Sequence, residues 1–173
     1  MTALRFTRNA NLWIKGGAAL DRGKGYEDVV AAQRTDADRV LNASISLALD
    51  KLVQQGEFYP FGVAITREGQ IAVLTTQDTA ARPTSDAFLG ALHDALSDGA
   101  RSGSFKATAI VADFSFERPR QTGEHDAIRV AVESAAGEAM TCYLPYTLVT
   151  PGGTRDVRPG QPFAQRGERS IFT

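Results

Sequence analysis

The sequence contains one cysteine and two histidines among 173 residues, and this scarcity limits the chemistry open to it. With Cys142 alone, an intramolecular disulfide is excluded, and its apolar surroundings favour a small buried side chain over a reactive thiol. Neither His93 nor His125 has a second histidine at a metal-ligand interval. We therefore predict no metal site and no cofactor, and we expect both histidines to lie at the surface.

Long apolar runs and motifs of known mechanism are also missing. No stretch of about 18 apolar residues is present, and the first residues lack the apolar core of a secretory signal, so we expect a cytoplasmic protein without a membrane partner. The sequence contains no HExxH, GxSxG, GxxxxGK[ST] or GxGxxG. The short run Gly23-Lys24-Gly25 lacks both a preceding strand and the Ser or Thr of a phosphate loop, which favours a basic linker.

The composition is that of one globular domain with unevenly distributed charge. Hydrophobic residues make up 43% of the chain and charged residues 23%, which is enough apolar content for a single buried core. The net charge of −1 divides into +4 for residues 1–25, −7 for residues 26–151 and +2 for residues 152–173. We therefore divide the chain into a basic N-terminal arm (1–25), an α+β domain (26–150) and a Pro/Gly-rich, irregular tail (151–173).

Two helices are expected from apolar residues that recur at steps of three and four. The first begins at Thr35, which has capping-box spacing to Asp38, and ends near Gln55, before Gly56. Whether residues 26–33 extend it backward stays open. The second follows the start signal at residues 83–86 and ends at Gly99 to Gly103.

Five strands are expected from β-branched and aromatic runs. They cover residues 58–66, 71–76, 105–117, 126–134 and 139–148, and the first two form a hairpin around Gly69. The short links favour antiparallel neighbours. The sequence therefore predicts a two-layer α+β fold, in which a five-stranded, mainly antiparallel sheet carries both helices on one face in the order α-β-β-α-β-β-β.

Several polar and aromatic residues are candidates for an interaction surface or a pocket. Asp113 interrupts an apolar strand, where a carboxylate needs a partner, and we expect Arg129 or Arg118 to supply it. Tyrosine and phenylalanine are enriched in protein interfaces, although most such residues in a small domain belong to the core. The full candidate set is Phe58, Tyr59, Phe61, Asp113, Asp126, Glu133, Tyr143 and Tyr146.

Three stretches, FYPFG at residues 58–62, DAI at 126–128 and LPY at 144–146, look like strand signatures of uncharacterised bacterial proteins of similar size. The order of elements between residues 36 and 148 resembles that of the roadblock and profilin-like class of small domains. In that class a five-stranded antiparallel sheet is flanked by helices. The resemblance implies a function through dimerisation or partner binding.

We therefore expect a non-enzymatic protein-binding or regulatory domain. An exposed sheet edge and the aromatic residues near Phe58 to Phe61 are the expected contact surfaces, and a homodimer is the simplest use of an unpaired edge. Two alternatives stay open. One is a small hydrolase or isomerase that uses Asp113, Glu133 and His125, which requires the three groups to converge. The other is nucleic-acid binding through the basic termini.

Overall fold

The computed structural model describes residues 4–8, 35–76, 85–117 and 124–173, of which 4–8, 76, 85, 116–117 and 124–125 are described as backbone only. The predicted basic arm therefore lies almost entirely outside the described residues, as do Arg118 and residues 26–33. The elements are β1 (Leu4–Arg8), α2 (Asp36–Gln55), β2 (Phe61–Thr66), β3 (Ile71–Thr76), α3 (Ser85–Arg101), β4 (Phe105–Glu117), β5 (Glu124–Ser134), β6 (Ala139–Val149), the 3-10 turn η1 (Pro151–Gly153), β7 (Asp156–Pro159) and β8 (Phe163–Arg166).

Local signals define both ends of α2. The Thr35 hydroxyl accepts from the Asp38 N–H (3.1 Å) and the Asp38 carboxylate accepts from the Thr35 N–H (3.2 Å), which completes the predicted capping box. At the other end, Gly56 adopts φ 83°, and its N–H donates to the carbonyl of Leu52. No helix in the described parts of the chain is long and apolar enough to cross a membrane.

The strands form one antiparallel sheet in the order β1-β3-β2-β4-β5-β6-β7, and β8 also pairs with β6. The five predicted strands correspond to β2–β6, and they lie next to one another as β3-β2-β4-β5-β6. The α+β class and the antiparallel sheet are thereby confirmed. The predicted count of five is too low for the described residues, because β1, β7 and β8 extend the sheet.

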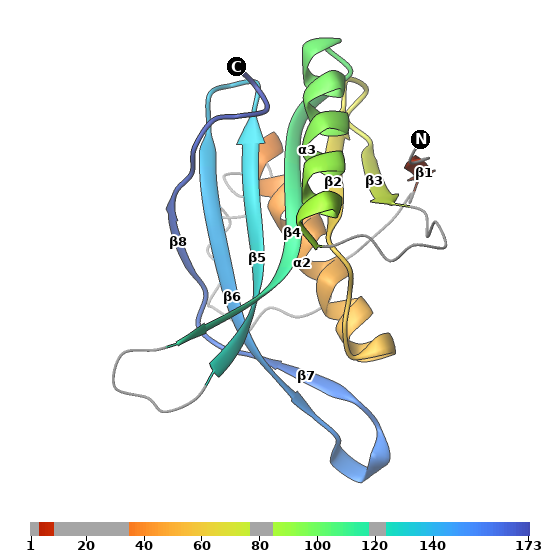
Figure 1. Cartoon of the computed structure of the whole chain (residues 1–173), viewed down its shortest axis with the longest axis vertical. Coiled ribbons are helices and arrows are strands. Elements are labelled where there is room, and N and C mark those ends of the chain that lie inside the picture. The colour runs from red at the N-terminus through yellow and green to blue at the C-terminus, as the bar shows by residue number, and fades with distance from the viewer. Residues whose placement is uncertain (1–3, 9–34, 77–84, 118–123) are drawn as a thin grey trace, which may run out of the picture.

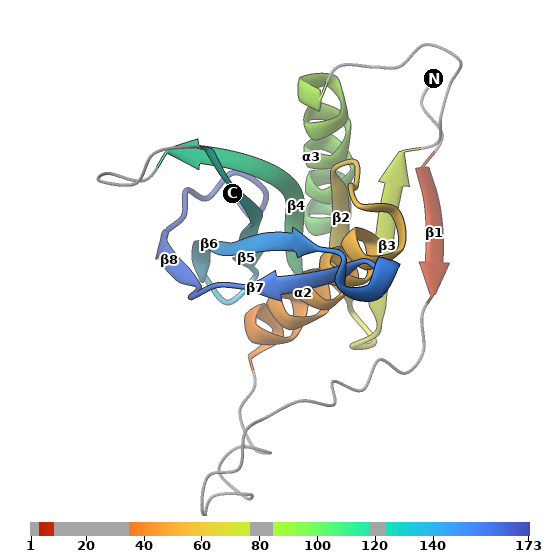
Figure 2. The same ribbon diagram turned by 90° about the horizontal axis from the view of Figure 1, so that it is seen from below.

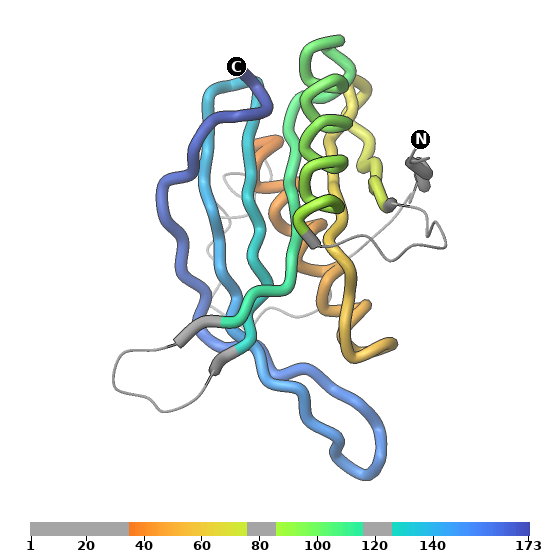
Figure 3. Tube along the Cα trace, viewed as in Figure 1, coloured from red at the N-terminus to blue at the C-terminus, as the bar shows by residue number. Residues whose placement is uncertain are grey.

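The C-terminal residues are not irregular, as the sequence suggested, but run back along the outer edge of β6 (Figure 3). First β7 pairs with residues 146–149 of β6, and then β8 pairs with residues 140–143. Between these two strands the Gly160 N–H donates to the carbonyl of Pro145 (2.7 Å). Proline and glycine obscure a strand pattern in the sequence, yet both are tolerated at a sheet edge or a bulge.

The two helices pack on opposite faces of the sheet, so the prediction of two layers with both helices on one face is wrong (Figure 1). One core, between the sheet and α2, includes Phe61, Val63 and Ile65 of β2. The other, between the sheet and α3, includes Ala64 of β2 and Leu74 of β3. Because β2 is buried on both faces, its apolar run is nearly continuous rather than alternating.

The end of the sheet that is formed by β6 and β7 curls around α2 (Figure 2). Val157 of β7 packs against the α2 core, and the Arg155 guanidinium donates to the carbonyl of Gln54 (3.1 Å) at the end of the helix. A cation at this position satisfies helix carbonyls that have no intrahelical partner. The opposite face of β5 and β6 is turned away from α2 and lines the groove described below.

Two glycines of α3 should respond in opposite ways to alanine. A Cβ at Gly99 would overlap the Phe105 ring, whereas a Cβ at Gly90 would meet nothing within 4 Å. We expect Gly99→Ala to lower the free energy of unfolding by about 1–3 kcal/mol through overpacking. We expect Gly90→Ala to raise it by about 0.5–1 kcal/mol, because alanine is the better helix former. Urea denaturation of both variants measures the difference, and equal effects would contradict this packing of α3.

Candidate functional site

The carboxylate of Glu133 holds the C-terminal segment against the sheet. Glu133 is only 6% exposed, and its two oxygens accept hydrogen bonds from the backbone N–H groups of Ser170, Ile171 and Phe172 at 2.9–3.1 Å. The Ser170 hydroxyl donates to it as well (3.1 Å). A buried carboxylate is tolerated when several donors replace its water. Glu133 therefore positions residues 170–172 and is not available as a ligand-binding group.

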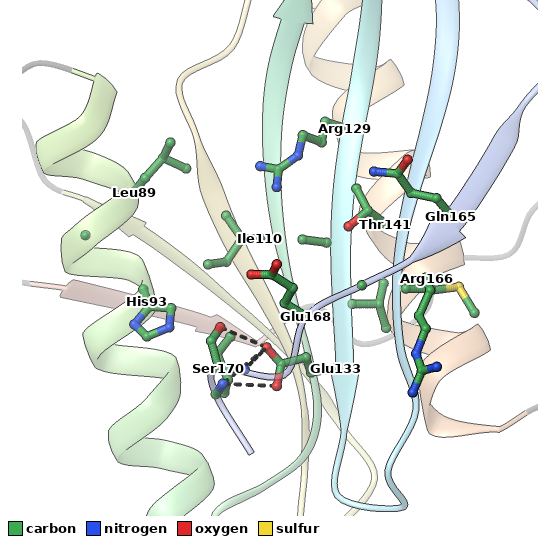
Figure 4. Close-up of a pocket in the computed structure, with 16 residues that line it drawn as sticks. Leu89, His93, Ile110, Arg129, Glu133, Thr141, Gln165, Arg166, Glu168 and Ser170 are labelled. Carbon is green, nitrogen blue, oxygen red and sulfur yellow. Dashed lines mark hydrogen bonds between the residues drawn. The ribbon is translucent and has the colours of Figure 1, made fainter. Parts of the chain in front are cut away.

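A groove of about 540 Å³ lies beside this anchored segment (Figure 4). Its floor is the face of β4, β5 and β6 that is turned away from α2, where Ile110, Ala131 and Thr141 lie opposite one another. Residues 165–171 form one wall, and Leu89, Gly90 and His93 of α3 form the other. His93 thus lies on the groove wall, where its side chain is 39% exposed.

Arg129 is the charged group of the floor. It is half-buried, and Figure 4 shows it extending from β5 toward α3. Among the residues that the structure describes, none forms a hydrogen bond or an ion pair with its guanidinium. The expectation that Arg129 pairs with Asp113 is wrong, because Arg129 and Asp113 occupy positions of opposite parity in the β4–β5 register and so face opposite sides of the sheet.

Three aromatic rings stand next to Arg129 on the same face. Tyr143 lies directly opposite Arg129 on β6, and Phe163 of β8 lies opposite Tyr143. The rings of Tyr143 and Phe163 stack with centroids 5.0 Å apart. The ring of Phe114, on β4, has its centroid 5.6 Å from that of Tyr143. We call these three residues the aromatic shelf. Phe114 and Phe163 are 41% and 47% exposed, so the shelf offers an apolar surface beside the guanidinium.

On the opposite face, the structure brings Asp113, Asp126 and Tyr146 together. The Tyr146 hydroxyl donates to the Asp113 carboxylate (2.9 Å), and the Ser115 hydroxyl donates to Asp126 (3.1 Å). Burial raises the pKa of Asp113, and the Asp126 charge raises it further, against the opposing effect of the Tyr146 hydrogen bond. Burial and the same carboxylates raise the pKa of Tyr146. Tyr146 thus keeps its proton at neutral pH and is the partner that Asp113 requires.

Asp113 and Glu133, two of the three groups of the alternative hydrolase or isomerase, do not converge. Asp113 lies opposite Ile128, whereas Glu133 lies opposite Thr108. Thr108 and Asp113 are five residues apart on β4, which corresponds to about 17 Å of strand, and their side chains point to opposite faces. The side chain of His125 lies outside the described residues. Because Asp113 and Glu133 cannot share a substrate, we do not propose acid–base catalysis by this pair.

The aromatic residues near the start of β2 divide between core and surface. Phe58 and Phe61 are buried and meet edge to face, with ring centroids 5.7 Å apart. They are core residues, so the prediction that they form a contact surface is wrong. Tyr59 is 59% exposed and lies beside the Phe88 ring. Cys142 is buried as predicted, and burial raises the pKa of its thiol.

Sequence reasoning missed most of the groove. Of the candidate set, Glu133 lines it and Tyr143 belongs to the aromatic shelf beside it. Gly90 offered a usable signal, because a glycine inside a helical pattern needs a reason. Thr141 and Gln165 gave none, since nothing local indicates that β6 and β8 pair.

The fold and the groove define a small α+β domain with a candidate binding site between a helix and the edge of an antiparallel sheet. Among the described residues, no group of three or more His, Cys, Asp or Glu side chains is placed to hold a metal ion. The chain matches no family model, and neither the curated proteins nor the solved structures contain a significant match to it.

Proposed function

We propose that this chain is a non-enzymatic protein-binding domain, and that the groove between α3 and residues 165–171 receives a segment of a partner protein. The observation that carries the proposal is the Arg129 guanidinium. It is half-buried in the groove and has no partner among the described residues. A guanidinium that has lost part of its water without gaining a carboxylate is costly in the isolated chain. A ligand that supplies the missing partner recovers this cost.

The residue types around Arg129 support a protein ligand. Arginine, tyrosine and phenylalanine are the residues enriched in the centres of protein interfaces. The aromatic shelf adjoins the groove, because Tyr143 is the cross-strand neighbour of Arg129, so an extended segment can lie along both. Partner binding is also what the resemblance to the roadblock and profilin-like class implies.

Gly90 supplies independent support. It lies in the middle of α3, where glycine costs about 0.5–1 kcal/mol relative to alanine. No neighbouring atom requires its small size, since a Cβ there would meet nothing within 4 Å. The open space above Gly90 is part of the groove. A partner segment can therefore lie against α3 at this position without displacing a side chain.

The test compares two substitutions at Gly90. Short random linear peptides displayed on phage are selected against the wild-type protein, and the affinities of enriched peptides are then measured for Gly90→Ala and Gly90→Trp. Both variants remove the glycine from the helix, but only tryptophan fills the groove. We expect Gly90→Ala to bind within about twofold of wild type and Gly90→Trp to lose at least tenfold, since blocking the pocket removes buried contact area.

Two results would contradict the proposal. One is a selection that enriches no peptide, and the other is a set of peptides that bind Gly90→Trp as tightly as Gly90→Ala. Thermal unfolding of both variants serves as the control for folding. A dimer in light scattering that Gly90→Trp dissociates would assign the groove to a second copy of the chain, and would overturn the proposal of a separate partner.

A further inference from the structure

We propose that the groove selects a segment that carries an acidic side chain, bound by Arg129, next to an aromatic side chain, stacked on the aromatic shelf. This inference rests on the proposed function and adds the chemistry of the partner. It makes Arg129 and the shelf the specificity-determining residues of the groove. An occupant without a carboxylate would leave the half-buried guanidinium without a charged partner.

The charge around Arg129 supports a carboxylate ligand. The two described acidic side chains that line the groove form no ion pair with it: Glu133 accepts hydrogen bonds from the C-terminal backbone, and the exposed Glu168 has no ion pair to Arg129. A guanidinium presents a planar set of donors that matches a carboxylate with two parallel hydrogen bonds. In a half-buried groove such a pair is less screened by water and salt than at an open surface.

Polar neighbours further along the floor suit the same ligand. Gln165 lies opposite Thr141, two residues along the strands from the pair Arg129 and Tyr143 and on the same face of the sheet. Among the described residues, its amide donates one long hydrogen bond, to the Tyr143 hydroxyl (3.4 Å). Gln165 can therefore turn to donate to a second carboxylate oxygen or to the ligand backbone. Thr141 is buried at this position, and its hydroxyl accepts or donates as the ligand requires.

The aromatic shelf supplies the adjacent contact. The Tyr143 ring stacks on Phe163 and is tilted against Phe114, and these two outer rings are 47% and 41% exposed. Offset stacking of a further ring on such a surface contributes beyond simple burial of apolar area. Because Tyr143 is the direct cross-strand neighbour of Arg129, both contacts fall within one short segment.

The test is a double-mutant cycle with peptides from the selection described above. The synthetic peptides are capped at both ends, so that only side chains provide carboxylates. We expect the enriched sequences to share an Asp or Glu beside an aromatic residue. Replacing that acid by its amide should weaken binding to wild type about tenfold, and Arg129→Gln should weaken binding of the acidic peptide by a similar factor. The amide peptide should bind Arg129→Gln with an affinity only slightly lower than that measured after either change alone.

The matched control is Arg158→Gln. It removes the same charge from the edge strand β7, where Arg158 is exposed, lies opposite Thr147 and does not line the groove. It should leave the affinity within about twofold, as surface substitutions usually do. Groove-dependent peptides without a shared acid, or acidic peptides that bind Arg129→Gln as tightly as wild type, would overturn this inference and leave the proposed function standing. If no selected peptide binds in a way that Gly90→Trp blocks, both this inference and the proposed function are overturned.

Discussion

Glu133→Gln is expected to lower the free energy of unfolding by about 3 kcal/mol and to release the C-terminal residues from the sheet. The variant keeps the size of the side chain but replaces one accepting oxygen by an NH2 group. That group would face the N–H donors of residues 170–172. Chemical denaturation measures the loss, and hydrogen exchange should show that the amides of residues 170–172 lose their protection.

The control for Glu133 is Glu168→Gln, which changes an exposed carboxylate on the same C-terminal segment and should alter stability by less than about 0.5 kcal/mol. Deleting residues 170–173 provides a second check. The deletion removes the same hydrogen bonds. It should therefore lower the free energy of unfolding much less when it is made in the Glu133→Gln variant than when it is made in the wild-type protein. If the deletion and Glu133→Gln lower the free energy of unfolding additively, Glu133 does not anchor this segment.

Phe61→Ala is expected to lower the free energy of unfolding by about 3–5 kcal/mol. Phe61 is 1% exposed, contacts the Phe58 ring edge to face, and lies under the Lys51 ammonium at 5.5 Å from the ring centroid. Its removal leaves a cavity in the core beneath α2. Urea denaturation gives the value.

Tyr59→Ala is the matched comparison two residues away. Tyr59 is exposed and contacts Phe88, so its loss should cost less than about 1.5 kcal/mol. Equal costs at the two positions would contradict the assignment of Phe61 to the core and of Tyr59 to the surface.

The sequence predicted the elements that local chemistry specifies. The capping box at Thr35, the glycine after Gln55 and the alternation in β5 each depend on neighbours within a few residues. The placement of the helices on both faces of the sheet was not predictable in this way. On the α3 side, β2 presents Gly62 and Ala64, which are too small to produce a distinct second stripe in the sequence.

The site escaped prediction because it is built from distant segments. Glu133 occupies the face of β5 that alternation predicts to be solvated, and it is buried only because residues 170–172 return to cover it. Arg129 could be identified as a charge within a strand. Its lack of a partner among the described residues emerged only when α3, β6 and β8 were placed around it.

The central claim is that the groove beside α3 binds a protein segment, and the affinity of a selected peptide for Gly90→Ala and Gly90→Trp tests it most directly. The structure leads us to expect near wild-type binding for alanine and at least a tenfold loss for tryptophan, because only the larger side chain fills the open space above the helix. Equal affinity for the two folded variants would contradict the claim.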